Sequence, residues 1–197
     1  MTAVGGLWLH LPLPSLLEWP QPYLLIGSAV FISIKLLRII GIVVANISLR
    51  GPSIATISQI TGDVVEIRVE LARSKKFRPG QFIYLNIPRL SLFGFHPFQI
   101  AWADQGKNGR QFIVLLVQTR RGFTARLTTE DKRWALIEGP YGQSVAVEQY
   151  RTVFFFATGI GIAGQLPFVK KLLELYYDSR AKARNIVLFW EVDYECK

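Results

Sequence analysis

The chain has 197 residues, half of them hydrophobic and only 19% charged, and this composition leans toward the membrane class. Its net charge is +9, yet residues 1–34 contain no lysine or arginine, and the cations from Lys35 onward are scattered without a nucleic-acid-binding motif. Cys196 is the single cysteine, which excludes a disulfide framework and a paired-cysteine metal site. The sequence therefore predicts a membrane segment followed by a cytoplasmic domain that binds no nucleic acid.

Residues 1–18 are predicted to be the remnant of an upstream membrane helix and a loop. They lack the basic start of a secretory signal, and Pro12 and Pro14 end any helix that begins near Leu7. His10 lies in this apolar stretch, and His96 is the only other histidine. On these residues alone, His10 is not expected to be a metal ligand.

Residues 19–49 are predicted to form a transmembrane helix. Residues 19–34 carry no charge and would rise about 24 Å as a helix, against about 30 Å for the hydrocarbon core of a bilayer. Lys35 and Arg38 then share one helix face, can reach lipid phosphates, and mark a cytoplasmic boundary. A buried core helix is the alternative, because residues 39–49 are apolar again.

Residues 50–150 are predicted to form a compact antiparallel β-barrel, because several short strands alternate with turn signals. Residues 64–71 alternate as a half-buried strand, and residues 112–117 are apolar enough for a strand buried on both faces. Further strands are expected over 82–87 and 134–138, and a short helix over 124–130.

Residues 151–197 show the pattern of one βαβ unit, which is the start of an α/β domain. A fully buried strand is expected over 152–157, a helix over 165–177, and a second strand over 185–191. Because one such unit cannot cover both faces of a parallel sheet, the chain is expected to be truncated here, and at its other end as well.

Three stretches have residues suited to a nucleotide cofactor, and each also has a plain structural reading. Gly159, Gly161 and Gly164 fit Gly-x-Gly-x-x-Gly, which receives phosphate oxygens at a helix start or simply allows close strand–helix packing. NAD and NADP are not distinguished by these residues. In Arg120-Arg121-Gly122-Phe123-Thr124, an arginine and the Thr124 hydroxyl suit a pyrophosphate, or else an ordinary helix capped by Thr124.

The third stretch is His96-Pro97-Phe98-Gln99. Phe98 can present its ring to a flavin, and Gln99 can hydrogen-bond the polar edge of that ring. The alternative is an edge strand that begins at a proline, with a core phenylalanine and a solvated histidine.

Taken together, these stretches resemble the fungal ferric-chelate reductase family, which is related to NADPH oxidases and to ferredoxin reductase-type flavoproteins. The resemblance covers nearly the whole chain and rests on residues 23–40, 77–82, 96–101, 122–124, 139–142, 159–167 and 188–191. It implies the following fold: a membrane helix, an FAD-binding antiparallel β-barrel, and the start of an α/β nucleotide-binding domain.

The resemblance also implies cofactors and their residues. FAD would be flanked by His96, Pro97, Phe98 and Gln99, where the family more often has Thr or Ser in place of Gln99. The pyrophosphate would lie at Arg121, Gly122 and Thr124. A nicotinamide dinucleotide, usually NADPH, would lie at Gly159, Gly161 and Ile162. His10 resembles the last of the haem-binding histidines, although the upstream haem helices are absent.

The resemblance implies a membrane-bound, FAD-dependent oxidoreductase that carries electrons from NADPH to a ferric or cupric chelate outside the membrane, in the plasma membrane with its cofactor domains cytoplasmic. No acid–base or proteolytic catalytic residue is expected. Two alternatives stay open. One is a superoxide-producing NADPH oxidase, and the other is a non-catalytic membrane protein that keeps a degenerate reductase fold.

Overall fold

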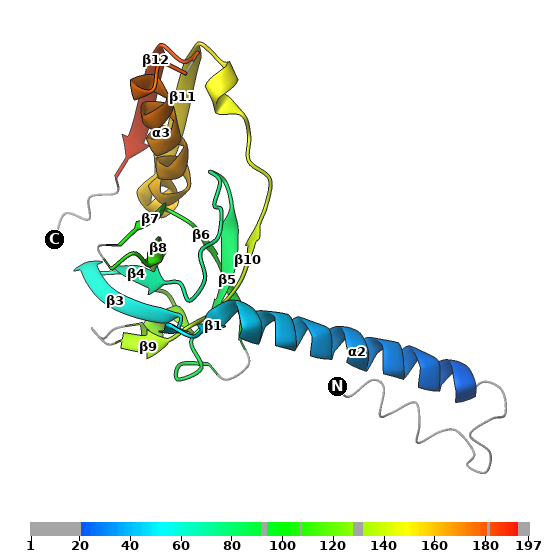
Figure 1. Cartoon of the computed structure of the whole chain (residues 1–197). Coiled ribbons are helices and arrows are strands. Elements are labelled where there is room, and N and C mark those ends of the chain that lie inside the picture. The colour runs from blue at the N-terminus through cyan, green and yellow to red at the C-terminus, as the bar shows by residue number, and fades with distance from the viewer. Residues whose placement is uncertain (1–20, 92–93, 107, 128–131, 181, 193–197) are drawn as a thin grey trace. The chain divides into compact units, whose positions relative to one another are not determined.

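The computed structural model describes residues 21–91, 94–106, 108–127, 132–180 and 182–192 (Figure 1). The predicted remnant over residues 1–18, with His10, lies outside the described residues, as does Cys196. The chain divides after Val43 into two units, which are taken in turn.

The first unit is dominated by the helix α2, which spans Gln21–Asn46 and runs on into the first residues of the second unit. Its 26 residues correspond to about 39 Å of helix. Among the described residues, it is the helix long and apolar enough to cross a membrane, and none of its most apolar stretch is buried inside the structure. That exposure does not fit the alternative of a core helix. The predicted basic pair lies within it, with Lys35 Nζ 5.2 Å from the ring centroid of Phe31, one turn earlier.

The second unit begins with a short hairpin, β1 (Ile47–Ser48) and β2 (Gly51–Pro52), followed by a five-stranded antiparallel sheet (Figure 1). The strands of this sheet, in the order β7-β8-β4-β3-β9, are Trp102–Gln105, Gln111–Gln118, Val64–Glu70, Ile54–Thr61 and Lys132–Trp134. The alternation predicted for residues 64–71 is confirmed, because Val65, Ile67 and Val69 are buried while their neighbours are half-buried.

A three-stranded antiparallel sheet, in the order β10-β5-β6, completes the β domain. Its strands are Leu136–Tyr141, Phe82–Asn86 and His96–Gln99. The strand predicted over 82–87 is confirmed. The strand predicted over 134–138 is wrong in its limits, because β9 ends at Trp134 and β10 starts at Leu136 and pairs on through Tyr141.

Side chains from both sheets meet in one hydrophobic core, which confirms the predicted antiparallel β domain. Ile57, Ile67 and Ile113 of the larger sheet and Leu85 and Ile137 of the smaller one belong to it, each at most 1% exposed. Complete burial of such a side chain contributes about 1.5–3 kcal/mol.

Two local expectations for the β domain are wrong. Strand β8 alternates between buried and half-buried residues and is not buried on both faces, because only one side of its sheet faces the core. The helix expected over residues 124–130 is a single 3₁₀ turn, η1 (Thr124–Arg126), and residues 128–131 lie outside the described part.

The predicted βαβ unit is present as β11 (Thr152–Thr158), the 3₁₀ turn η3 (Gly159–Gly161), α3 (Ile162–Tyr177) and β12 (Asn185–Glu191). A further 3₁₀ turn, η2 (Val147–Gln149), precedes it. Strands β11 and β12 pair in parallel over seven residue pairs, from Thr152↔Asn185 to Thr158↔Glu191. Helix α3 starts at Ile162 and not at Gln165, since η3 leads directly into it.

The strand predicted as fully buried is not so in this structure. Val153, Phe155 and Ala157 of β11 are buried, and Val153 and Phe155 pack in a core with Leu172 of α3. Phe154 and Phe156 face the other way and are 56% and 69% exposed. The helix therefore covers one face of this two-stranded sheet. The expected order of an apolar helix, an antiparallel β domain and the start of an α/β domain is confirmed.

Candidate functional site

Strand β6 contains the His-Pro-Phe-Gln stretch and forms an edge of the three-stranded sheet. An edge position suits Pro97, which has no amide proton to give to a neighbouring strand. Successive residues of a strand point to opposite faces, so His96 and Phe98 share one face while Pro97 and Gln99 share the other. The edge strand of the plain reading is therefore present, and it also offers two aromatic rings on one side.

Those two rings meet a third ring from a distant part of the chain. His96 stacks on Phe123 with centroids 4.3 Å apart and ring planes 18° from parallel, and Phe98 lies 6.2 Å from Phe123. Phe123 is only 8% exposed, so it holds this position from within the core. The structure thus brings the His96–Gln99 segment next to the segment around Gly122, as one site requires.

Gly122 gives this second segment its shape. Its φ of +83° lies in the left-handed region, and a Cβ placed on it would meet nothing within 4 Å. A ligand can therefore approach the main chain here, with the exposed side chain of Arg121 beside it. Thr124 is not the N-cap that the sequence suggested. The N-cap is Phe123, and Thr124 Oγ1 accepts a hydrogen bond from the Arg120 amide at 2.8 Å, closing the loop.

Gln99 points away from the stacked rings. Its Nε2 donates to the carbonyl oxygen of Gln81 at 3.1 Å, which ties β6 to the start of β5. A Cβ built on Gly164 would lie 3.9 Å from Gln99 Cγ, an ordinary van der Waals distance. The Gln99 side chain at the end of β6 therefore faces the first turn of α3.

The turn before β5, which the sequence did not assign to a site, supports the segments described above. Gly80 has a φ of +83°, and a Cβ there would lie 3.0 Å from the Phe168 ring of α3. A Cβ on Gly142, whose φ is +92°, would lie 3.3 Å from the Gly80 carbonyl. Lys75 Nζ donates to the Gly139 carbonyl at 2.7 Å, and burial lowers the pKa of that lysine. The signal in the sequence is the pair of glycine-containing turns, each needing a backbone that other residues rarely adopt.

The turn η3 stands at the carboxyl end of β11, where sequence predicted a nucleotide site. Gly159 has a φ of +48°, and neither Gly159 nor Gly161 would bring a Cβ within 4 Å of another atom. Trp190 Nε1 donates to the Gly159 carbonyl at 3.0 Å and fixes the turn from the neighbouring strand. Ile162 is only 7% exposed, so its side chain packs inside the protein and is not free to contact a ligand.

A shallow recess of about 460 Å³ lies beside this turn, lined by residues 156–158 of β11 and 189–191 of β12. Ligands of open parallel sheets bind at the carboxyl ends of the strands, which is where this recess lies. Glu191 is in its lining, although the sequence alone did not indicate an acid for a ribose hydroxyl. An acid at the end of the strand after a glycine-rich turn is the signal that could have identified it, because a carboxylate there can accept a ribose hydroxyl.

No group of metal ligands occurs among the residues that the structure describes. His10, expected as a haem ligand, lies outside them and stays a prediction. The site therefore comprises two places. One joins the His96–Gln99 and Gly122 segments, and the other is the recess at η3.

Known proteins match the same regions. Residues 49–145 match the family model described as an FAD-binding domain. A probable cell surface ferric reductase of Aspergillus oryzae is 32% identical over 63% of this chain and 18% of its own length. The heavy chain of a superoxide-generating NADPH oxidase from Dictyostelium discoideum is 25% identical over 64% of this chain and 28% of its own length. The chain thus spans about a fifth to a quarter of these relatives.

Among solved structures, an NADH-dependent reduced ferredoxin-NADP oxidoreductase is similar in fold. The match has a TM-score of 0.57 and 23% identity, and covers 73% of this chain and 49% of that one. The residues present fit a flavin dinucleotide. Half-buried Phe98 offers an aromatic face, and the open main chain at Gly122 with Arg121 offers room and charge for a diphosphate.

Proposed function

Because residues 49–145 match an FAD-binding domain and the chain is similar to ferric reductases and NADPH oxidases, we propose that it is a member of their superfamily, binds FAD and takes part in electron transfer from NADPH to a ferric or cupric chelate across a membrane. The observation that carries the proposal is the stacking of His96 on Phe123 at 4.3 Å. It joins two segments that are both suited to one flavin dinucleotide, within the stretch that matches an FAD-binding domain.

In this proposal each residue has a defined role. Phe98 would supply an apolar ring face for the flavin, and His96, stacked on Phe123, would hold the two segments together. Gly122 admits the diphosphate to the main chain, Thr124 donates its hydroxyl proton, and Arg121 balances the negative charge. Bound FAD supplies the redox chemistry, since it accepts two electrons as hydride and releases them singly, and the protein fixes its position.

The nicotinamide dinucleotide is proposed to bind the recess at η3. Gly159, Gly161 and the main chain of Ile162 would receive its phosphates. Glu191 bears on the choice of dinucleotide, because a carboxylate accepts a free ribose hydroxyl but repels a 2′-phosphate. The family resemblance favours NADPH, so comparing NADH with NADPH as reductant tests which influence dominates.

We propose that α2 crosses the plasma membrane with the cofactor-binding unit on the cytoplasmic side. The exposed apolar surface of the helix supports a lipid environment. Lys35 and Arg38 would lie toward the cytoplasmic leaflet, where their long side chains reach the phosphates. Electron transfer to the far side needs a further carrier, and the family resemblance implies haem in the complete protein, with His10 as one ligand.

The experiment is an FAD titration of the full chain in lipid nanodiscs, followed by flavin fluorescence. Phe98→Ala and Thr124→Ala should each weaken FAD binding, the latter about 2- to 10-fold for one lost hydrogen bond. Phe154→Ala, an exposed phenylalanine of β11 outside the recess, and Thr61→Ala, at the exposed end of β3, are the matched controls. If the full chain takes up no FAD, or if neither site variant differs from its control, the flavin site is wrong.

A superoxide-producing oxidase is the second candidate, because a superoxide-generating relative matches the same part of the chain. Oxygen consumption compared with ferric-chelate reduction separates the two activities. A chain that binds FAD but does not oxidise NADPH with an artificial acceptor would instead be a non-catalytic member of the fold.

A further inference from the structure

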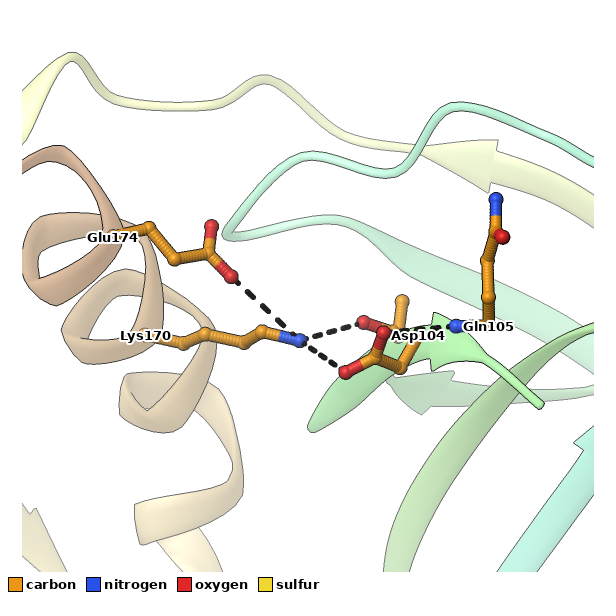
Figure 2. Close-up of polar contacts among 5 residues, drawn as sticks. Asp104, Gln105, Lys170 and Glu174 are labelled. Carbon is orange, nitrogen blue, oxygen red and sulfur yellow. Dashed lines mark hydrogen bonds and ion pairs between the residues drawn. The ribbon is translucent and has the colours of Figure 1, made fainter. Parts of the chain in front are cut away.

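Lys170 of α3 contacts three consecutive residues of β7 in the β domain. Its Nζ donates to the Ala103 carbonyl oxygen at 2.9 Å and to Asp104 Oδ2 at 3.0 Å. The same ammonium lies 4.2 Å from the ring centroid of Trp102. Figure 2 shows the lysine reaching from the helix to the strand. One cation is thus held by a carbonyl dipole, a carboxylate and an aromatic face, and we name this contact the Lys170 clasp.

A neighbouring group contacts each side of the Lys170 clasp. Glu174, one turn further along α3, places Oε1 3.8 Å from the ammonium (Figure 2). The Asp104 carboxylate accepts the Gln105 amide at 2.8 Å through Oδ1. The Lys170 side chain is 21% exposed, so solvent and salt screen this contact less than a fully exposed ion pair.

The Lys170 clasp lies close, along the chain, to both proposed cofactor segments. Lys170 follows the start of α3 at Ile162 by about 12 Å of helix, and η3 immediately precedes that start. On the other side, β7 begins at Trp102, shortly after β6 ends at Gln99. Any movement of α3 along β7 therefore changes the separation between η3 and the His96–Gln99 segment.

Two other contacts between α3 and the sheets of the β domain, among the described residues, are uncharged. Gly164 approaches Gln99, and the Phe168 ring packs on Gly80, where even a Cβ would come within 3.0 Å. Such packing brings the two parts close but is largely non-directional, so it permits small sliding movements. The clasp supplies the directional contact, because the ammonium must face two defined oxygens at once.

We propose that Lys170 is a positioning residue, whose clasp on β7 holds η3 at the separation from the His96–Gln99 segment that hydride transfer from the dinucleotide to FAD requires. The dinucleotide is the reductant and FAD the oxidant in that transfer, and Lys170 exchanges neither proton nor electron. This role rests on the proposed function. The effect of the clasp on the separation does not, because it can be measured without any cofactor.

The test measures a distance by electron spin resonance in the full chain in nanodiscs. Spin labels are attached at Thr61→Cys in the β domain and Tyr177→Cys at the end of α3, in a Cys196→Ser background. Lys170→Met keeps most of the side chain but removes the charge, and should shift or broaden the distance by about 2 Å. Lys170→Arg, which can still donate to both oxygens, should restore the parent distance.

Lys171→Met is the matched control. Lys171 is the next residue of the same helix and forms an equally short ion pair, 2.8 Å from Glu148 in η2, but it does not reach β7. Its loss should leave the distance unchanged. An unchanged distance in Lys170→Met, or an equal shift in both variants, overturns the clasp.

The second readout is single-turnover reduction of bound FAD. Lys170→Met should slow reduction about 10- to 100-fold while the Kd for the dinucleotide stays the same, since misplacement by an ångström costs rate more than binding. An unchanged reduction rate despite a shifted distance overturns the positioning role. Failure to bind FAD counts against the proposed function instead, and the distance measurement still decides the clasp.

Discussion

Asn46 allows a quantitative test of how the β domain is held together. Its side chain is 2% exposed and forms two hydrogen bonds with one residue of β10: Nδ2 donates to the Ile137 carbonyl at 2.8 Å, and Oδ1 accepts the Ile137 amide at 2.9 Å. Strand β10 lies at the edge of its sheet, so the side-chain amide takes the place of a neighbouring strand.

The Asn46→Ala variant leaves the Ile137 amide and carbonyl buried without these partners. Each such group costs about 1–3 kcal/mol, so we expect a loss of about 2–6 kcal/mol in the free energy of unfolding. A domain of ordinary stability has about 5–15 kcal/mol in total. For a unit of this size the loss corresponds to a Tm lower by about 5–20 °C.

The assay is thermal unfolding of the full chain in detergent micelles, followed by near-ultraviolet circular dichroism. Asn185→Ala removes an exposed asparagine at the start of β12 and should change the free energy by no more than about 0.5 kcal/mol. Asn46→Asp should be at least as harmful as the alanine variant at neutral pH, because a carboxylate oxygen would then face the Ile137 carbonyl. A loss in Asn46→Ala no larger than that of Asn185→Ala would refute the reasoning.

Two further predictions concern the contact between α3 and the β domain. Gly80→Ala forces a Cβ to within 3.0 Å of the Phe168 ring at a φ of +83°, so it should lower stability by about 1–3 kcal/mol in denaturant unfolding, whereas Gly62→Ala, with open space around it, should not. The pKa of Asp104 is lowered from its ordinary value of 3.8, chiefly by the hydrogen bond from Lys170. The contribution of the Asp104 carboxylate to stability is therefore present above its ordinary pKa and is lost as the pH falls through the lower folded-state pKa. The spin-label distance should accordingly stay constant down to about pH 4 and change only in stronger acid. In Asp104→Asn this change in acid should not occur.

Alternation could be predicted wherever one face of a strand meets the core and the other meets solvent. Residues 64–71 show this in the sequence because every second residue, Val65, Ile67, Val69 and Leu71, is buried. Strand β3 could not be recognised in the same way. Its exposed Ile60 and half-buried Ile54 stand where a clean alternation would place polar residues. Apolar side chains at the surface are common and hide the period of the strand.

Continuous apolar runs predicted where strands lie, but not which faces of those strands are covered by other elements. Strand β11 reads as buried in the sequence, yet Phe154 and Phe156 are exposed because the described residues place a helix on one face only. Which face is covered depends on elements beyond the strand itself, and no local pattern contains that information.

The sequence predicted the separate segments of the candidate site, but not which of them contact one another in the fold. Gly122 and Gly159 were recognisable because turns with positive φ favour glycine. The stack of His96 on Phe123 was not, since the two residues lie on different elements and meet only when both sheets close around one core. The Lys170 clasp is likewise a tertiary contact, and a lysine on a helix usually indicates only a solvated face.

The hydrogen bond from Trp190 to the Gly159 carbonyl gives the glycine-rich turn an optical reporter of its own. Indole emission depends on the hydrogen bond of the ring nitrogen and on the polarity around the ring. A dinucleotide that reshapes η3 or fills the recess alters both, so its binding changes the emission of this tryptophan without any attached dye. In a chain whose other four tryptophans are replaced by phenylalanine, binding at η3 can thus be followed apart from the yellow absorbance of the flavin.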